Sequence, residues 1–194
     1  MATTIHVEGQ TVDDTGELVF PDETERIDAK AFASNKEVTR VVLPKNLKQI
    51  GDSAFYDCTN LEEIVFPEGL ETIGKEAFYG CVNLEAIDLK AGATAIGRGA
   101  FASCRMLCTV NLPTSLISIG NNAFSHCDLQ LTKIQLPSGL KEIGCKAFGN
   151  CIKLTNVDIP SGVTEINDSL FYGCRNLSSV NLGNVSRIGA RAFM

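Results

Sequence analysis

The sequence predicts an α/β solenoid, in which units of about 23 residues stack to give a parallel sheet on one face and short helical turns on the other. Two observations support this fold class. Each unit contains a short alternating apolar segment, which in six units is followed by proline. Phenylalanine also recurs at intervals of 23, 23, 23, 23, 24, 23 and 22 residues, at Phe32, Phe55, Phe78, Phe101, Phe124, Phe148, Phe171 and Phe193. A fixed period of this length is typical of a stack of repeats, which is one elongated unit.

Residues 1–16 do not fit the repeat, and we expect them to form an N-terminal capping strand or hairpin. Residues 3–7 alternate apolar and polar, as do residues 17–20, and the segment Asp13-Asp14-Thr15-Gly16 between them is rich in turn formers. A terminal rung of a solenoid is an open sheet edge that needs such a cover. Residues 17–194 then make seven to eight repeats, the last of them truncated.

An apolar pair separated by one residue begins each repeat and predicts a short strand with one buried face. Ile64 and Phe66 form the clearest pair, and Pro67 then ends the strand because proline cannot donate to a sheet ladder. The equivalent pairs are Leu18/Phe20, Val41/Leu43, Ile87/Leu89, Val110/Leu112, Ile134/Leu136, Val157/Ile159 and Val180/Leu182.

The second half of each repeat predicts a return to the core followed by a short helical turn. In the third full repeat Leu70 turns inward and Gly74 marks a bend. Phe78, Cys81 and Leu84 follow at offsets of three, which would place them on one buried side of a helical turn.

Two departures from the period are local: one repeat is one residue longer, and Gly183-Asn184-Val185 in another lacks the proline and is one residue short. Leu129-Gln130 adds one residue before Leu131 and causes the spacing of 24. The last unit stops at Phe193-Met194, halfway through a repeat, so we expect either that the native protein continues or that another element covers that edge.

The repeated pattern C-x-x-L-x-x-V-x-L-P, together with I-G-x-x-A-F, resembles the BspA-like leucine-rich repeats over about residues 17–194. Known members are mostly surface proteins of bacteria and of parasitic or commensal protists, linked to adhesion and to binding of host proteins. The resemblance implies a curved leucine-rich repeat solenoid that is secreted or at the cell surface. The family has no catalytic residues to transfer, and its binding residues are not fixed by a motif.

Six of the eight cysteines occupy one repeat position, which is open to two interpretations. They could form a metal ladder or lateral disulfides, or a column of small buried thiols. We favour buried thiols, because free cysteine is among the most buried residue types, paired C-x-x-C spacing is missing and bridges between rungs would be strained. Unpaired thiols leave a cytoplasmic, reducing or anaerobic setting open beside the cell surface. The six are Cys58, Cys81, Cys104, Cys127, Cys151 and Cys174.

Composition excludes several classes of function. The sequence contains no run of about 18 apolar residues that could insert into a membrane. It also contains no dense cluster of Lys and Arg that could bind nucleic acid. The two histidines, His6 and His126, have no carboxylate and nucleophile arranged around them, so we expect no enzyme and no metal or other cofactor. Residues 1–97 carry 18 acidic and 8 basic side chains and residues 98–194 carry 5 and 9, an asymmetry that either favours end-to-end self-association or is compositional drift.

Strand positions that alternate with the buried pairs must face outward and form two columns on the sheet face. Three stacked valines, Val19, Val42 and Val65, open one column and suggest a contact patch, although valine is also common on sheet surfaces. We predict a non-enzymatic module that binds a protein or glycan partner through this face; the alternative is a structural spacer or self-assembling rod. The predicted binding residues are Arg40, Val42, Glu63, Val65, Asp88, Asn111, Lys133, Gln135, Asp158 and Asn181.

Overall fold

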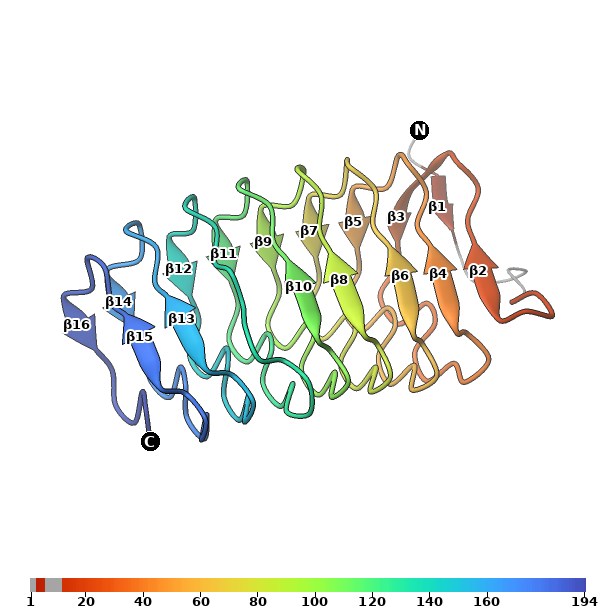
Figure 1. The fold of residues 1–194 in the computed structure, drawn as a ribbon. Helices are drawn as coiled ribbons and strands as arrows, with labels where there is room; N and C mark the ends of the chain where they lie inside the picture. The colour runs from red at the N-terminus through yellow and green to blue at the C-terminus, as the bar shows by residue number, and fades with distance from the viewer. Residues whose placement is uncertain (1–2, 6–11) are drawn as a thin grey trace.

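The computed structural model describes residues 3–5 and 12–194 and shows a solenoid of stacked turns (Figure 1). Its described strands number sixteen, and every pair of them is parallel. They lie in two layers that run along the solenoid, as Figure 1 shows, and each layer is divided into separately paired groups of strands. The parallel stack with its period of about 23 residues confirms this part of the predicted fold class.

We call the first sheet the front sheet; it contains the alternating segments predicted from the sequence. Its apolar pairs face inward, so that Ile64 and Phe66 are 6% and 3% exposed while Val65 between them is 38% exposed. The sheet is divided into the groups β2-β4-β6, β8-β10 and β13-β15. Its strands are β2 (Glu17–Val19), β4 (Arg40–Val42), β6 (Glu63–Val65), β8 (Ala86–Asp88), β10 (Thr109–Asn111), β13 (Asn156–Asp158) and β15 (Ser179–Asn181).

The second sheet, the rear sheet, was not predicted. Most of its strands have two residues, as in Thr72–Ile73, with one buried side chain just before the glycine of the repeat. Two residues cannot show an alternating pattern in the sequence. It is divided into a group of seven strands, which ends at β12, and the pair β14-β16. Its strands are β1 (Thr3–Ile5), β3 (Thr24–Ile27), β5 (Gln49–Ile50), β7 (Thr72–Ile73), β9 (Ala95–Ile96), β11 (Ser118–Ile119), β12 (Glu142–Ile143), β14 (Glu165–Ile166) and β16 (Arg187–Ile188).

The predicted short helical turns are wrong, because the residues that the structure describes contain no helix. In this third face, the turn face, every second N–H bonds to the next repeat: Ser53 donates to the carbonyl of Lys75 and Phe55 to that of Ala77, both at 2.7 Å. An α-helix would direct these N–H groups to its own preceding turn. Ser53 also has a φ of 56°, in the left-handed region, which interrupts any helical path.

The core is a set of columns in which like residues stack on like. Consecutive rings from Phe32 to Phe193 lie with centroids 5.1–5.8 Å apart and nearly parallel planes. Beside them the cysteine column is buried as predicted, except for half-buried Cys174. Each thiol donates to the carbonyl of a phenylalanine in an earlier repeat, as Cys104 Sγ does to Phe78 O at 3.2 Å. Each thiol of the cysteine column therefore has a hydrogen-bond acceptor inside the core.

The N-terminal strands join different sheets. β1 pairs with β3 in the rear sheet, and β2 pairs with β4 in the front sheet. The predicted capping role of residues 1–16 stays a prediction, and residues 1–2 and 6–11 of that segment lie outside the described residues. In the part of the chain that is described, no helix is long and apolar enough to cross a membrane.

Candidate functional site

All ten predicted binding residues lie in two adjacent outward columns on the front face, eight of them on strands of the front sheet and two, Lys133 and Gln135, on the strand-free segment 132–136 that lies between β10 and β13 on this face. Arg40 and Val42 are half-buried and the other eight are exposed. The columns are in register where the strands pair, so that Arg40 lies beside Glu63 and Val42 beside Val65. The structure therefore brings these residues onto one surface, and their role in binding stays a prediction.

Ion pairs between repeats occupy the first rungs of this surface. Arg40 lies between two glutamates: its guanidinium bonds to Glu17, and its Nε lies 2.9 Å from Glu63 Oε2. The hydrogen bond that Arg40 donates to Glu17, followed by the one it donates to Glu63, raises the pKa of Arg40 further above its ordinary value. These charges are thus engaged with one another rather than available to a partner.

The valine stripe runs beside those ion pairs. Val19, Val42 and Val65 are directly opposite one another on β2, β4 and β6. Val19 is 56% exposed and Val65 38%. An exposed apolar stripe of this kind offers hydrophobic contact area with polar groups at its border.

Asp88 ends the valine column and is neutralised within its own repeat. Lys90 bonds to its carboxylate, and that hydrogen bond lowers the pKa of Asp88. A hollow of about 510 Å³ lies here, where β6 and β8 are not paired. Its lining includes Glu63, Val65, Asp88 and Lys90.

The front sheet splits again between β10 and β13, at the repeat that follows the inserted residue. On the regular rung, the N–H groups of Cys108 and Thr109 donate to the carbonyl of Glu85 at 2.8 and 3.3 Å. Among the described residues, neither Thr132 nor Lys133 makes the equivalent bond to the rung before it. Residues 132–136 form no strand, and one bridge, from Lys133 to Asn156, ties them to β13.

The N–H groups at the ends of these strands show how far the split extends. Leu43, Leu89 and Ile159 each donate to the next rung, at 3.1, 3.0 and 2.8 Å. Leu112 and Leu136 make no such bond within the described ladder. Phe20 and Phe66 also lack it, but only Leu112 and Leu136 are successive rungs, so the ladder is most open here.

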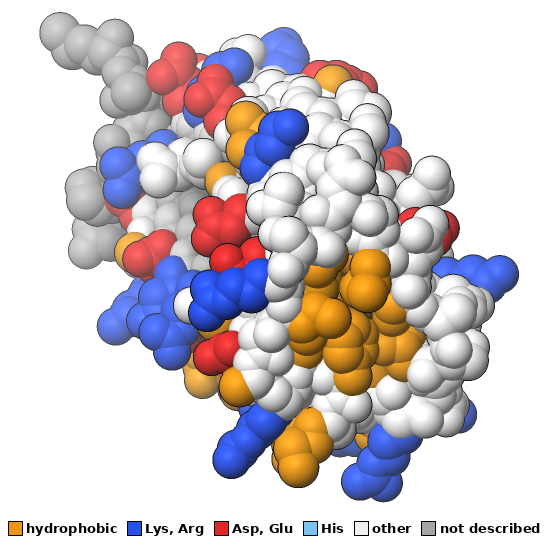
Figure 2. Space-filling view, turned by 90° about the vertical axis from the view of Figure 1, so that its left-hand side faces the viewer, with side chains coloured by type: hydrophobic (Ala, Val, Ile, Leu, Met, Phe, Trp, Pro, Cys, Tyr) orange, Lys and Arg blue, Asp and Glu red, His pale blue; other side chains and the backbone are white. Residues whose placement is uncertain are grey.

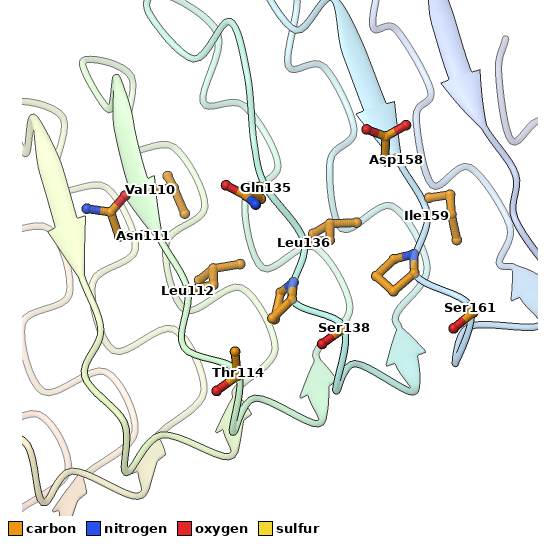
Figure 3. Close-up of a pocket in the computed structure, with 12 residues that line it drawn as sticks. Val110, Asn111, Leu112, Thr114, Gln135, Leu136, Ser138, Asp158, Ile159 and Ser161 are labelled. Carbon is orange, nitrogen blue, oxygen red and sulfur yellow. The ribbon is translucent and has the colours of Figure 1, made fainter.

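A groove of about 490 Å³ lies over this open part of the sheet (Figure 3). One polar row crosses three rungs at Asn111, Gln135 and Asp158, and Figure 3 shows the three side chains in line. A floor of leucine, isoleucine and proline separates it from a second polar row. The floor and the second row are formed by Leu112, Leu136, Pro137, Ile159, Pro160, Thr114, Ser138 and Ser161.

The groove extends past the predicted residues. A second hollow of about 510 Å³, lined by Lys133 and Asn156, shares Gln135 and Asp158 with it. The sequence interpretation missed Thr114, Ser138 and Ser161. Each directly follows the proline of its repeat, and a search of that loop for polar residues would have found them.

The remaining chemistry of the described residues is sparse. No group of three histidine, cysteine or acidic side chains in residues 3–5 and 12–194 could hold a metal ion. His126 lies on the turn face with its Nε2 3.1 Å from Asn150 Nδ2, and His6 falls outside the described residues. Hydrogen bonding, charge and apolar contact on the front sheet are therefore what this surface offers.

Comparison with known proteins identifies the repeat. The chain matches the BspA type leucine rich repeat region over residues 25–131 and 119–194, in six copies. The crystal structure of the T. pallidum leucine rich repeat protein TpLRR is similar, with 31% identity, a TM-score of 0.63, and coverage of 93% of this chain and 76% of that one.

A second solved structure supports the fold alone. The leucine rich cell surface protein from Faecalibacterium prausnitzii A2-165 is 24% identical with a TM-score of 0.58, and the match covers 92% of this chain and 66% of that one. No curated protein matches the sequence. The family match spans most of the chain and agrees with the observed solenoid, so this protein belongs to the BspA-type leucine-rich repeat family.

Proposed function

We propose that the chain is a non-enzymatic interaction module that binds a protein, or alternatively a glycan, through its front sheet. The observation that carries this proposal is the sheet's surface: three hollows lie over it, together with an exposed valine stripe and polar side chains, such as Gln135, that have no partner among the described residues. Leucine-rich repeat proteins generally bind proteins, which agrees with the family match. The core columns are closed to solvent, so recognition rests on the outward columns.

A location outside the cell, as an adhesin-like surface or secreted protein, is part of the proposal. It rests on the family, whose known members are mostly surface proteins. The eight free cysteines favour a reducing or anaerobic environment, because oxidising compartments favour disulfides. Both conditions are met by a surface protein of an organism that lives without oxygen.

The test uses the full chain, immobilised, with phage-displayed peptides and a glycan array as ligands. Val65→Asp places a charge in the stripe, and we expect it to abolish binding of ligands that contact this face. Ile117→Asp is the matched control, because Ile117 is 52% exposed beside β11 on the rear sheet. If both variants bound as well as the unchanged protein, the front-sheet assignment would be wrong. It would also be wrong if only Ile117→Asp lost binding.

A second candidate function, end-to-end assembly, is favoured by the rung at residues 179–194. Figure 2 looks onto this end and shows an apolar centre with basic side chains around it. Ile188 and Phe193 are 51% and 46% exposed, whereas Ile166 and Phe171, one repeat earlier, are 0% and 1% exposed. Residues 169–194 contain three arginines and no acidic residue, while residues 12–28 contain seven acidic residues and one arginine. We propose a second copy, docked by its acidic end, as the occupant of this surface.

Sedimentation velocity over a range of concentrations tests the assembly. Head-to-tail contact predicts growth beyond two copies, weakened by 0.5 M salt and abolished by Ile188→Asp but not by Ile117→Asp. A protein that stays monomeric at high concentration would overturn this candidate and leave the end to another occupant. Growth that stops at two copies would replace it with contact between like ends.

A further inference from the structure

We propose that the groove between β10 and β13 binds an extended peptide segment that carries a basic side chain. The inference rests on the proposed function and assigns one part of the front sheet to one class of ligand. The groove lies at the point where two successive rungs lack ladder bonds, and it is lined by polar groups from three repeats.

Peptide groups match the hydrogen-bonding groups of the groove. Leu112 and Leu136, whose N–H groups have no ladder acceptor, both line it. The side-chain amides of Asn111 and Gln135 can each donate and accept, as a peptide group does. Gln135 makes no hydrogen bond among the described residues, so its amide is available to a ligand.

The dimensions also suit a short length of chain. Neighbouring strands in a sheet lie about 4.8 Å apart, so the polar row from Asn111 to Asp158 spans at least about 10 Å. Three residues of an extended chain cover about the same distance. A segment of three to four residues lying along the solenoid axis would therefore contact every side chain of the row.

The charge of the groove selects a cation. Asp158 is the charged residue of the lining and has no ion pair among the described residues. Asp88 holds the same place three repeats earlier in the pattern but is neutralised by Lys90. Pro160 occupies the position equivalent to Lys90, so the repeat of Asp158 has no basic group at the place where Lys90 neutralises Asp88. A lysine or arginine of the ligand would complete this pair.

The same lining disfavours other ligands. It has no aromatic side chain on which a sugar ring would stack. Its negative charge would repel the phosphates of a nucleic acid. The floor instead consists of aliphatic and proline side chains, among them Leu136, Pro137 and Pro160, which suit the apolar parts of a peptide.

The experiment uses a positional-scanning array of acetylated hexapeptide amides, probed with the full chain. We expect lysine or arginine to be preferred over norleucine and glutamate at one position. Asp158→Asn should lower that signal roughly fivefold, the ratio that an exposed ion pair supports. Asp158→Lys should reverse the preference toward glutamate. Asp14→Asn, which removes an exposed charge in the N-terminal turn, is the matched control and should bind as the unchanged chain does.

Each other outcome is decisive. Absence of a basic preference, or equal signals from Asp158→Asn and the unchanged chain, would overturn the inference. If Val65→Asp abolished peptide binding while Asp158→Asn did not, the front sheet would remain the binding face and the groove assignment would fail. Glycan binding that depends on Asp158 would refute the peptide class. Equal urea midpoints for all variants would exclude loss of folding as the cause.

Discussion

The cysteine column should make this protein unstable at alkaline pH. Burial raises the pKa of Cys58 to about 11, and it raises the pKa of Cys174 to about 11 as well. For the four cysteines between them burial, the largest cause, holds the pKa well above its ordinary value; these are Cys81, Cys104, Cys127 and Cys151. The perturbation is a rise from pH 7.5 to pH 10.

The sign and size of the effect follow from proton linkage. Below about pH 8.5 the thiols are protonated in both states, so their contribution to stability is fully present. Above it the unfolded chain loses protons that the folded chain keeps, and the free energy of unfolding falls by up to about 1.4 kcal/mol per pH unit for each buried thiol. At pH 10 each of the four contributes a loss of about 2 kcal/mol, and together about 8 kcal/mol, comparable with the whole stability of many domains.

Urea unfolding followed by circular dichroism, in the presence of a reductant, measures this loss. Cys104→Ala removes one fully buried thiol and should reduce the loss between pH 7.5 and pH 10 by about 2 kcal/mol. Cys108→Ala removes an exposed thiol and should follow the unchanged protein. All other ionisable groups are the same in the three proteins, so their contributions cancel in the comparison.

The test compares the pH dependence of the free energy of unfolding between variants, and the stability of any one variant at a single pH does not decide it. Cys104→Ala will lower the free energy of unfolding at pH 7.5, because the thiol bonds to Phe78 O and fills core volume. A pH dependence identical to that of the unchanged protein would refute the reasoning. So would an equal change in Cys108→Ala, since exposure would then not matter.

Three further predictions concern the stack. Phe101→Ala, at a site that is 0% exposed, should lower the free energy of unfolding by about 3–5 kcal/mol in urea, and Phe193→Ala, at 46% exposed, by less than half as much. Gly97→Ala would place Cβ 2.6 Å from the backbone of the previous repeat and should cost on the order of 2 kcal/mol. At Gly69 the nearest atom to such a Cβ is Lys48 Nζ at 3.2 Å, the end of a flexible side chain, so Gly69→Ala should cost far less by the same measurement. Deleting Gln130 restores the regular spacing and should restore the ladder, which hydrogen exchange would show as slower exchange of residues 132–136; unchanged exchange would contradict the assigned cause of the split.

The parts of the fold that the sequence predicted are those that depend on side-chain burial. Ile64 and Phe66 alternate with Val65, so the inward and outward faces of the front sheet could be assigned before the structure. The ten proposed binding residues were chosen from this alternation of inward and outward positions alone, and all lie on the predicted surface.

The parts that were missed depend on backbone hydrogen bonds between repeats. Lys30, Ser53 and Asp57 take left-handed conformations on the turn face without being glycine or asparagine. Their conformation is stabilised by the chain above and below, as in the bond from Asp57 to the carbonyl of Tyr79 at 2.7 Å, which no local pattern records. The spacing of three between the apolar residues of each repeat is therefore compatible with a helix. The hydrogen bonds between stacked repeats stabilise a non-helical backbone instead.

The inserted residue was visible in the sequence, but its effect on the site was not, because that effect depends on a balance of energies. Leu131, Ile134 and Leu136 remain 0%, 7% and 8% exposed beside the insertion. Burial of such side chains stabilises by about 1.5–3 kcal/mol each, while a ladder bond replaced by a bond to water loses about 1 kcal/mol. The chain therefore keeps its core in register and gives up ladder bonds on the front sheet. One extra residue at a corner of the repeat thus opens a groove without weakening the columns that support it, and a repeat protein can in this way vary its outer surface while its core stays fixed.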